Sequence, residues 1–465
     1  MKHTFLFAII LLAASSIVRS QDSLSIQNPD ENKLKISGDL TTDERVLLKN
    51  KSNWAWNENR LTLMLNKKNS DGSKFYSEIW LRNLGLPSLT TSANLYNKGI
   101  VDPYNIEIRE AYIQKFDFLI KKLDLKIGRQ RIVWGTADKL NPTDNLNPFD
   151  MEDVLDFGRH RASDAVNLNY YLSNDFSLQG VYIPFFQPAN LPLGIFANVL
   201  NPSMQMPQGM VLKGFSDTLL MPKYNLGESS VAGGKLKGAF KGVDFSLSYV
   251  WGRDGLPTAI RNIFIPVDTM GGIKINSQLE FTRNHIIGAD LATSIAGIGF
   301  WAEAALFMPE KDVIMTNDLS AFYPMSPVSV TIDTTILDKK EPYIKFVVGG
   351  DYNFKDGSYL NFQYMHGFIH EKGNDNLKDY FFIRYDKKFF NEKLKIAPLG
   401  GAFIVTDWNN IKDNYAIAYM PQILYKASDD IEITLSTAIF DGKGDNLFAK
   451  LKDYNMFMFK LKYNF

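Results

Sequence analysis

The final nine residues of the chain alternate strictly between apolar and mostly polar side chains. Every second position is apolar, in the order Phe457, Phe459, Leu461, Tyr463 and Phe465, and Met458, Lys460, Lys462 and Asn464 stand between them. Because side chains on a β-strand point to opposite faces in turn, this segment is predicted to be a strand with one apolar face. Alternating segments of similar character recur from about residue 60 onward, and their length suits a tilted strand that crosses a membrane.

The N-terminal segment has the pattern of an export signal. Lys2 and His3 precede an apolar run from Phe5 to Ala14, and Ser20 provides a small residue before Gln21. We expect residues 1–20 to be a signal peptide that is removed. A membrane anchor is the alternative, but the run is far shorter than the ~20 residues that a spanning helix needs.

Links of two lengths separate the alternating segments. Short links rich in turn residues lie at 173–175, 355–358 and 428–430, and long links lie at about 135–162, 184–228, 253–276, 308–341 and 441–452. Bacterial barrels show this contrast between short periplasmic turns and long outer loops. We therefore expect an all-β fold: a transmembrane, antiparallel, up-and-down β-barrel over residues 38–465, with long extracellular loops partly folded into the lumen.

The strand count is expected to be about 18, with about 14 or 16 as alternatives, because pattern alone places boundaries only within a few residues. Residues 21–37 show no clear period and are expected to form an N-terminal lead-in. A soluble β-sandwich is disfavoured, since it would have short turns at both ends and a shorter chain.

Composition narrows the functional classes. The chain has 51 basic and 51 acidic side chains, so it lacks the basic excess that a nucleic-acid binder needs. It has no cysteine, which excludes disulfides, thiolate metal sites and a lipidated N-terminal cysteine. Of its five histidines, His366 and His370 are four apart, a spacing that is not a metal clamp on a strand and loop. We expect no cofactor, no metal and no catalytic centre.

The C-terminal segment resembles the closing strand of Gram-negative outer-membrane β-barrels. A second resemblance rests on the run from Leu123 to Asp150, which contains Gly-Arg-Gln at 128–130, Trp-Gly at 134–135 and two Asn-Pro-x-Asp units at 141–144 and 147–150. With Glu110-Ala-Tyr112, the segment 287–293 and Glu303, this run resembles a superfamily of outer-membrane barrels related to alginate-export and phosphate-selective porins.

These resemblances imply a location and partners. They imply an outer-membrane protein of a Gram-negative bacterium in contact with outer-membrane lipid and lipopolysaccharide. They also imply that the row Phe457, Phe459, Leu461, Tyr463 and Phe465 closes the barrel and is the signal read by the barrel assembly machinery. The neutral charge gives no reason to transfer a phosphate or alginate substrate.

Two interpretations of the motif region stay open. Its opposite charges form either a constriction whose transverse field screens solutes, or pairs that only pin the loop in place. Arg129 and Arg131 share strand parity with Ile127, so a role in the lumen requires a bulge or a departure from the strand. The candidate residues are Glu110, Arg129, Gln130, Arg131, Trp134, Asp138, Asn141, Asp144, Asn147, Asp150, Arg159, Arg161 and Glu303.

The link from Pro184 to Pro222 is rich in proline and large apolar side chains. So much apolar surface is expected to be buried in the lumen or over its mouth. It serves either as a plug or as an adaptable lining for hydrophobic solutes. The candidate lining residues are Phe185, Phe186, Phe196, Met204, Met206 and Met210.

The sequence therefore predicts an outer-membrane porin or channel for passive or substrate-gated passage of small organic solutes, hydrophobic ones among them. The alternative is an export or lipid-handling component of a multiprotein envelope system, and a barrel hydrolase is less favoured. The pattern leaves the oligomeric state, the solute and the direction of transport open.

Overall fold

The computed structural model describes residues 33–49, 53–87, 89–156, 158–197, 199 and 209–465. The expected signal peptide and residues 21–32 of the expected lead-in lie outside the described residues. Nineteen strand segments form one closed antiparallel sheet, in which β21 (Tyr415–Tyr419) and β22 (Gln422–Lys426) both pair with the same two neighbours. These two segments are halves of one strand, so the barrel has 18 strands, as predicted.

Each barrel strand pairs with the next one along the chain, and the last pairs with the first. The remaining strands are β1 (Lys35–Leu47), β2 (Trp54–Lys68), β3 (Ser73–Leu84), β4 (Tyr104–Lys115), β5 (Leu123–Gln130), β6 (Ser163–Tyr171), β7 (Phe176–Ile183), β9 (Val231–Phe240), β10 (Val243–Arg253), β13 (Arg283–Ile295), β14 (Ile298–Pro309), β17 (Tyr343–Asn353), β18 (Ser358–His366), β19 (Asp379–Phe389), β20 (Leu394–Val405), β23 (Ile431–Lys443) and β24 (Met456–Asn464).

The C-terminal strand closes the barrel with the two faces that its alternation predicts. β24 runs antiparallel to β1, with Phe459 opposite Glu44 and Lys460 opposite Asp43. The Lys460 Nζ atom lies 3.1 Å from the Asp43 carboxylate inside the lumen. Phe459 and the other members of its row therefore face outward.

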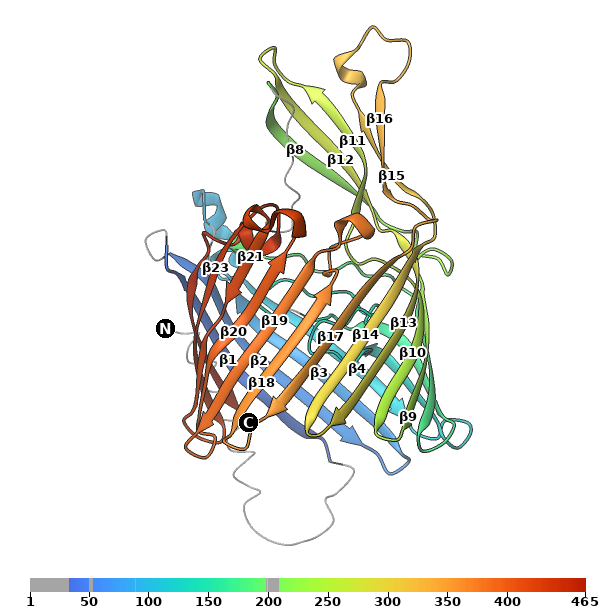
Figure 1. Ribbon diagram of the computed structural model, residues 1–465, viewed down its shortest axis with the longest axis vertical. Coiled ribbons are helices and arrows are strands. Elements are labelled where there is room, and N and C mark those ends of the chain that lie inside the picture. Colours follow the sequence, from blue (N-terminus) through green and yellow to red (C-terminus); the bar gives the residue numbers. More distant parts are fainter. Residues whose placement is uncertain (1–32, 50–52, 88, 157, 198, 200–208) are drawn as a thin grey trace.

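The two ends of the barrel differ as the link lengths predict: short turns lie at one end and the long links at the other (Figure 1). Among the described residues, the short helical turns lie in links at the long-link end of the barrel: η2 (Ser92–Tyr96), α2 (Lys98–Val101), η3 (Gly194–Phe196), η4 (Ser320–Phe322), η5 (Asn374–Asn376), η6 (Trp408–Asp413) and α3 (Leu447–Lys450). Within the described ranges, no helix has the length and apolar character needed to cross a membrane.

A second sheet projects beyond the long-link end of the barrel (Figure 1). It has the order β16 (Thr331–Leu337), β15 (Val313–Asp318), β11 (Thr258–Pro266), β12 (Gly272–Glu280) and β8 (Val211–Leu220), with β11–β15 and β12–β8 parallel. The links at 253–276 and 308–341 thus contain strands that the sequence did not predict. The link 184–222 is not buried throughout, because β8 is almost entirely exposed at the sheet edge.

The link between β5 and β6, here called the lumen loop (residues 131–162), lies inside the barrel. Its Ile132, Trp134 and Leu146 pack with inward side chains of β6 to β17. Leu140 and Val154 pack with inward side chains of β17 to β24, together with Phe196 from the following link. The loop therefore fills most of its section of the lumen and leaves its charged face toward β1 to β4.

Candidate functional site

The Gly-Arg-Gln motif fixes the point where the chain turns into the lumen. Gly128 has φ +119°, and a Cβ atom there would lie 2.5 Å from the Ala111 carbonyl oxygen. The Gln130 side chain has no exposed surface, and its Nε2 donates to the Ala165 carbonyl at 2.9 Å. These residues are thus part of the packing between wall and loop.

The Trp-Gly and Asn-Pro units hold the loop from within. Trp134 is buried and donates to Gln179 Oε1 at 2.9 Å. Asn147 Oδ1 accepts from the Ile132 N–H at 2.7 Å, and Asn147 Nδ2 donates to Ser163 Oγ at 3.0 Å. The loop has no regular backbone pairing, and these side-chain hydrogen bonds hold it in its place.

Glu303 of β14 clamps the loop from the opposite wall. Its carboxylate accepts hydrogen bonds from the N–H groups of Thr136 and Thr143 at 3.0 and 2.7 Å, and from the Thr143 hydroxyl at 2.7 Å. Asn141 Nδ2 donates to it at 3.1 Å. Gly135 has φ +95°, and a Cβ atom there would lie 2.5 Å from this carboxylate. Glu303 therefore positions the loop and does not line either of the chambers described below.

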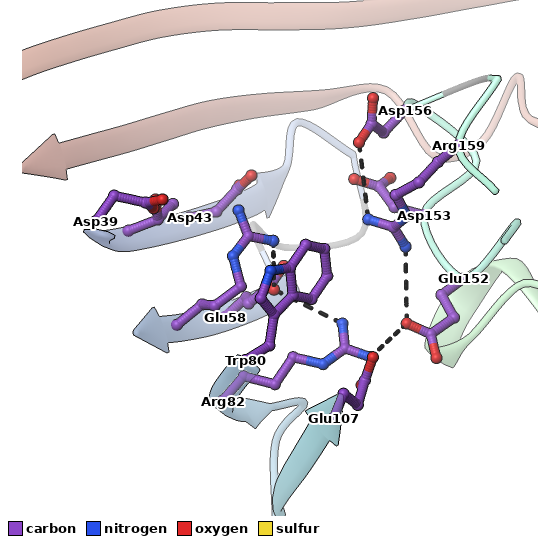
Figure 2. Close-up of polar contacts among 12 residues, drawn as sticks. Asp39, Asp43, Glu58, Trp80, Arg82, Glu107, Glu152, Asp153, Asp156 and Arg159 are labelled. Atoms are coloured by element: carbon purple, nitrogen blue, oxygen red, sulfur yellow. Dashed lines mark hydrogen bonds and ion pairs between the residues drawn. The ribbon is translucent and has the colours of Figure 1, made fainter. Parts of the chain in front are cut away.

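Three acidic residues of the lumen loop, here called the acidic seam, pair with arginines on different wall strands. The pairs and their N···O distances are Asp150 with Arg109 of β4 (2.9 Å), Glu152 with Arg82 of β3 (2.5 Å) and Asp153 with Arg45 of β1 (2.5 Å). Figure 2 shows Arg82 between Glu58, Glu107 and Glu152. Arg159 of the loop also binds Asp150, at 2.9 Å. The seam thus ties the loop to the wall strands.

Trp80 of β3 organises the arginines at the seam. The guanidinium carbons of Arg60 and Arg109 lie 4.2 and 4.1 Å from its ring centre, and that of Arg159 lies 5.8 Å away. The ring nitrogen donates to Glu78 Oε1 at 2.9 Å. Stacking on the aromatic face holds these guanidinium groups while leaving their edges free to donate.

Burial and ion pairing shift the pKa values of the loop carboxylates in opposite directions. Burial opposes ionisation of Asp153, but the Arg45 guanidinium lowers the pKa of Asp153 to about 2. Burial likewise opposes ionisation of Asp150, and Arg159 and Arg109 hold its pKa below the ordinary value. Burial raises the pKa of Asp144, which His160 and Arg131 offset only in part. The seam carboxylates Asp150 and Asp153 are therefore ionised at neutral pH.

Two polar cavities flank the loop. The upper chamber, of about 520 Å³, lies between the loop and β2 to β4, and the lower chamber, of about 490 Å³, lies toward the short-turn end. Both are lined by Val133, Gly135 and Thr136, so the two chambers adjoin at this segment. Val133 is 58% exposed, an apolar side chain between two polar spaces.

The candidate residues divide between the chambers and the packing. Glu110, Arg131, Asn141, Asp144 and Arg159 line the upper chamber, and Trp134 lines the lower one. Gln130, Asn147, Asp150 and Glu303 line neither and hold the loop by the contacts given above. The Asp138 side chain is exposed and also lines neither chamber, and Arg161 Nη1 donates to Asn190 Oδ1 at 3.0 Å.

Arg129 lies outside the lumen. β5 pairs with both neighbours without a register shift, so Arg129 keeps the outward orientation of Ile127 and lies 4.0 Å from Asp164 of β6. Arg131 follows the end of the strand and reaches the upper chamber. The alternation allowed either a bulge within the strand or an end of the strand before Arg131. The structure shows the second, because β5 ends at Gln130.

The apolar link contributes mainly to packing. Phe186 and Phe196 are 5% and 0% exposed, whereas Phe185 is 52% exposed and Met210 is half-buried. Met204 and Met206 lie outside the described residues. The described part of this link therefore resembles a plug more than an open apolar lining.

Sequence reasoning missed the wall residues that face the loop: Arg60, Glu78, Trp80, Arg82, Glu107 and Arg109. A signal was present, because charged and aromatic residues recur with period two in 58–60, 78–82 and 107–109. His366 and His370 make separate local contacts: His366 Nδ1 lies 2.8 Å from an Asp379 carboxylate oxygen, and the half-buried His370 ring packs edge-on against Phe368. Across the described ranges, no three metal-binding side chains come together.

Comparison with known proteins gives matches in sequence and in structure. A family model described as Protein of unknown function (DUF1302) matches residues 57–198, a range that includes the whole lumen loop, most of β2 and all of β3 to β7. No curated protein gives a significant match. The expected relation to alginate-export and phosphate-selective porins stays a prediction.

Similar solved structures include Pseudomonas aeruginosa OccK11 (OpdR), with 9% identity, 95% of this chain and 99% of that chain covered, and a TM-score of 0.46. They also include OmpT, an outer membrane protein of Vibrio cholerae, with 12% identity, 95% and 100% covered, and a TM-score of 0.42. A third is the outer membrane channel DcaP of Acinetobacter baumannii, with 12% identity, 95% and 100% covered, and a TM-score of 0.39.

Proposed function

We propose that this protein is a channel of the Gram-negative outer membrane that passes small, water-soluble organic solutes. The observation that carries the proposal is the pair of polar chambers, of about 520 and 490 Å³, that adjoin at Val133, Gly135 and Thr136. Each has the size of a small-molecule site. The upper chamber borders β2 to β4 in the long-link half of the lumen, and the lower chamber borders β4 to β13 in the short-turn half.

The lining of the upper chamber carries both charges with one cation in excess, and its arginines favour solutes that carry a carboxylate. It is lined by Arg60, Arg109, Arg131, Lys139 and Arg159 and by Glu78, Glu110, Asp144 and Asp156. Glu107 and Asp150, which bind Arg109, lie outside the lining. Guanidinium groups whose carboxylate partners lie behind them still offer N–H donors to a planar anion. The burial of Phe186 and Phe196 weakens the case for hydrophobic solutes.

The test is to narrow the junction between the chambers. Val133→Trp adds bulk where both chambers meet, so conductance in planar bilayers and solute uptake into liposomes are expected to fall several-fold. Val133→Thr, which keeps the shape of the side chain, is the control and is expected to match the unaltered protein. Absence of conductance and uptake in the unaltered protein would contradict the channel.

A second candidate is an export or lipid-handling component of a multiprotein envelope system. The projecting sheet favours it, because edge strand β8 exposes Val211, Phe215 and Leu219. An open strand edge with exposed apolar side chains is a site where another chain can add a strand. Isolation of a stable envelope complex, together with a barrel that conducts no ions, would favour this function over the channel.

A further inference from the structure

The outer wall carries a polar patch at membrane depth, formed by Thr42, Glu44, Asn57 and Asn59 of β1 and β2. Their neighbours along the strands point into the lumen, where Arg45 binds Asp43 and Arg60 binds Glu58. Because strand side chains alternate, the patch residues face outward. We call them the β1–β2 patch.

The surroundings of the patch place it at the level of the acyl chains. On β24, Leu461 lies opposite Thr42 and Phe459 lies opposite Glu44, and both belong to the outward apolar row. On β1 itself, Leu40 and Val46 flank the patch. Outward positions on the other side of the barrel are apolar, as at Leu247, Ile287 and Val348.

The patch leaves hydrogen-bonding capacity unused. Thr42 Oγ1 donates to Asn59 Oδ1 at 2.8 Å, and Asn59 Nδ2 donates to Asn57 Oδ1 at 3.3 Å. Among the residues that the structure describes, none forms a hydrogen bond or ion pair with the Glu44 carboxylate. Hydrocarbon offers no partner to such a group, and polar residues at this depth are costly unless they are paired.

We infer that the β1–β2 patch is a contact surface between two copies of this chain. Across a two-fold axis along the membrane normal, β1 of one copy faces β2 of the other. In the register of the hairpin, Glu44 pairs with Asn57 and Thr42 with Asn59, so the same pairs would face one another between copies. The Asn57 amide donates and the Glu44 carboxylate accepts, which makes the patch complementary to itself.

A lipid headgroup fits the patch less well. Outer-leaflet headgroups with phosphates would repel the Glu44 carboxylate, and the patch contains no lysine or arginine to bind them. Apolar side chains border the patch on β24, at Phe459 and Leu461. On its other side Asn83 of β3 lies opposite Asn59 and donates to Asp102, and the exposed Ile106 and Ile108 lie beyond it on β4. The inference does not rest on the proposed channel function.

Cross-linking in the native outer membrane tests the inference, because the chain has no cysteine. Thr42→Cys and Asn59→Cys, made as two separate single variants and co-expressed, are expected to form a disulfide between copies on mild oxidation and to give a band of twice the chain mass, because these positions face one another across the axis. Leu247→Cys, on the other side of the barrel, is the control and is expected to stay single with either variant. Glu44→Cys co-expressed with Asn57→Cys repeats the test if one of the first two variants does not assemble.

A second measurement separates a contact between copies from a lipid-facing patch. Glu44→Leu and Asn57→Leu are expected to weaken self-association about tenfold each in mild detergent, measured by light scattering, since each removes a hydrogen-bonding partner. Unaltered self-association with a raised melting temperature would overturn the inference. So would an unaltered protein that stays a single copy, or Asn59→Cys joined to a chain of another mass.

Discussion

The two faces of the lumen loop meet the barrel wall in opposite ways. Toward the long-link ends of β6 to β17 the contact is apolar, with Ile132, Trp134 and Leu146 buried, and the cavity there has only about 70 Å³. The lower chamber lies nearer the short-turn ends of β6 to β13. Toward β1 to β4 the contact is charged, and the space left is about 520 Å³. Apolar side chains pack closely and exclude water. Ion pairs are local contacts, and cavities can remain between them. The same loop can therefore seal one sector of a lumen and keep another open.

The largest expected effect comes from removing one partner of the acidic seam. Arg45→Met leaves the Asp153 carboxylate buried without its ion-pair partner and leaves Asp43 with Lys460 alone, so the free energy of unfolding is expected to fall by about 4 kcal/mol. Denaturant unfolding in detergent micelles measures the loss. The double variant Arg45→Met with Asp153→Leu is expected to regain much of it. A loss under about 1 kcal/mol for Arg45→Met would show that the seam does not hold the loop.

On the apolar face, Leu146→Ala is expected to lower the free energy of unfolding by about 3 kcal/mol, because it opens a cavity in close packing. Ion selectivity should stay unchanged, since Leu146 lines neither chamber. Denaturant unfolding and single-channel reversal potentials measure the two quantities on one sample. A shift in selectivity would mean that the apolar face also borders the solute path.

Acid is expected to weaken the charged face selectively. The pKa of Asp153 is about 2 in the folded chain against an ordinary 3.8, so the unfolded chain binds the proton first as pH falls. The stabilisation from Asp153, on the order of 2 kcal/mol, is therefore complete above about pH 4 and is lost as pH falls through 2. Unfolding at pH 6 and pH 2 should show this extra loss in the unaltered protein and not in Asp153→Asn. Equal losses in both proteins would contradict it.

The smallest expected effect on stability is that of Arg131→Glu, under about 0.5 kcal/mol, because Arg131 is exposed in the upper chamber. Reversal potentials in a salt gradient are nevertheless expected to shift toward cations, since the change reverses a charge on the solute path. Arg129→Glu makes the same change on the outer wall and serves as the control. Equal shifts in both variants would place Arg131 outside the path.

Much of the barrel could be predicted from the sequence because period two is a local property. The alternation in 457–465 and 243–251, and the short turns between the strands, required no knowledge of distant contacts. The Gly-Arg-Gln run was singled out only by its resemblance to a family motif, and the structure places the end of β5 at its last residue, Gln130. Its glycine has the positive φ that the close approach to Ala111 requires.

The projecting sheet and the charged wall could not be predicted in the same way. β11 and β15 pair with strands from other links, and such pairings depend on which links meet in space. Alternation predicts that Arg60 shares a strand face with Glu58, and Trp80 with Glu78. It does not predict which part of the wall the loop will contact. Arg129 and Arg131 differ by two positions and end on opposite sides of the barrel wall because β5 ends between them.

The parallel pairings β12–β8 and β11–β15 join three separate links into one projecting sheet. In each of the three links at least one strand pairs with a strand of another link. All three links therefore form the surface at this end of the protein together. An antibody that recognises the native sheet would bind a conformational epitope shared by all three. A linear peptide copied from β8 would present the sequence of that epitope without its shape.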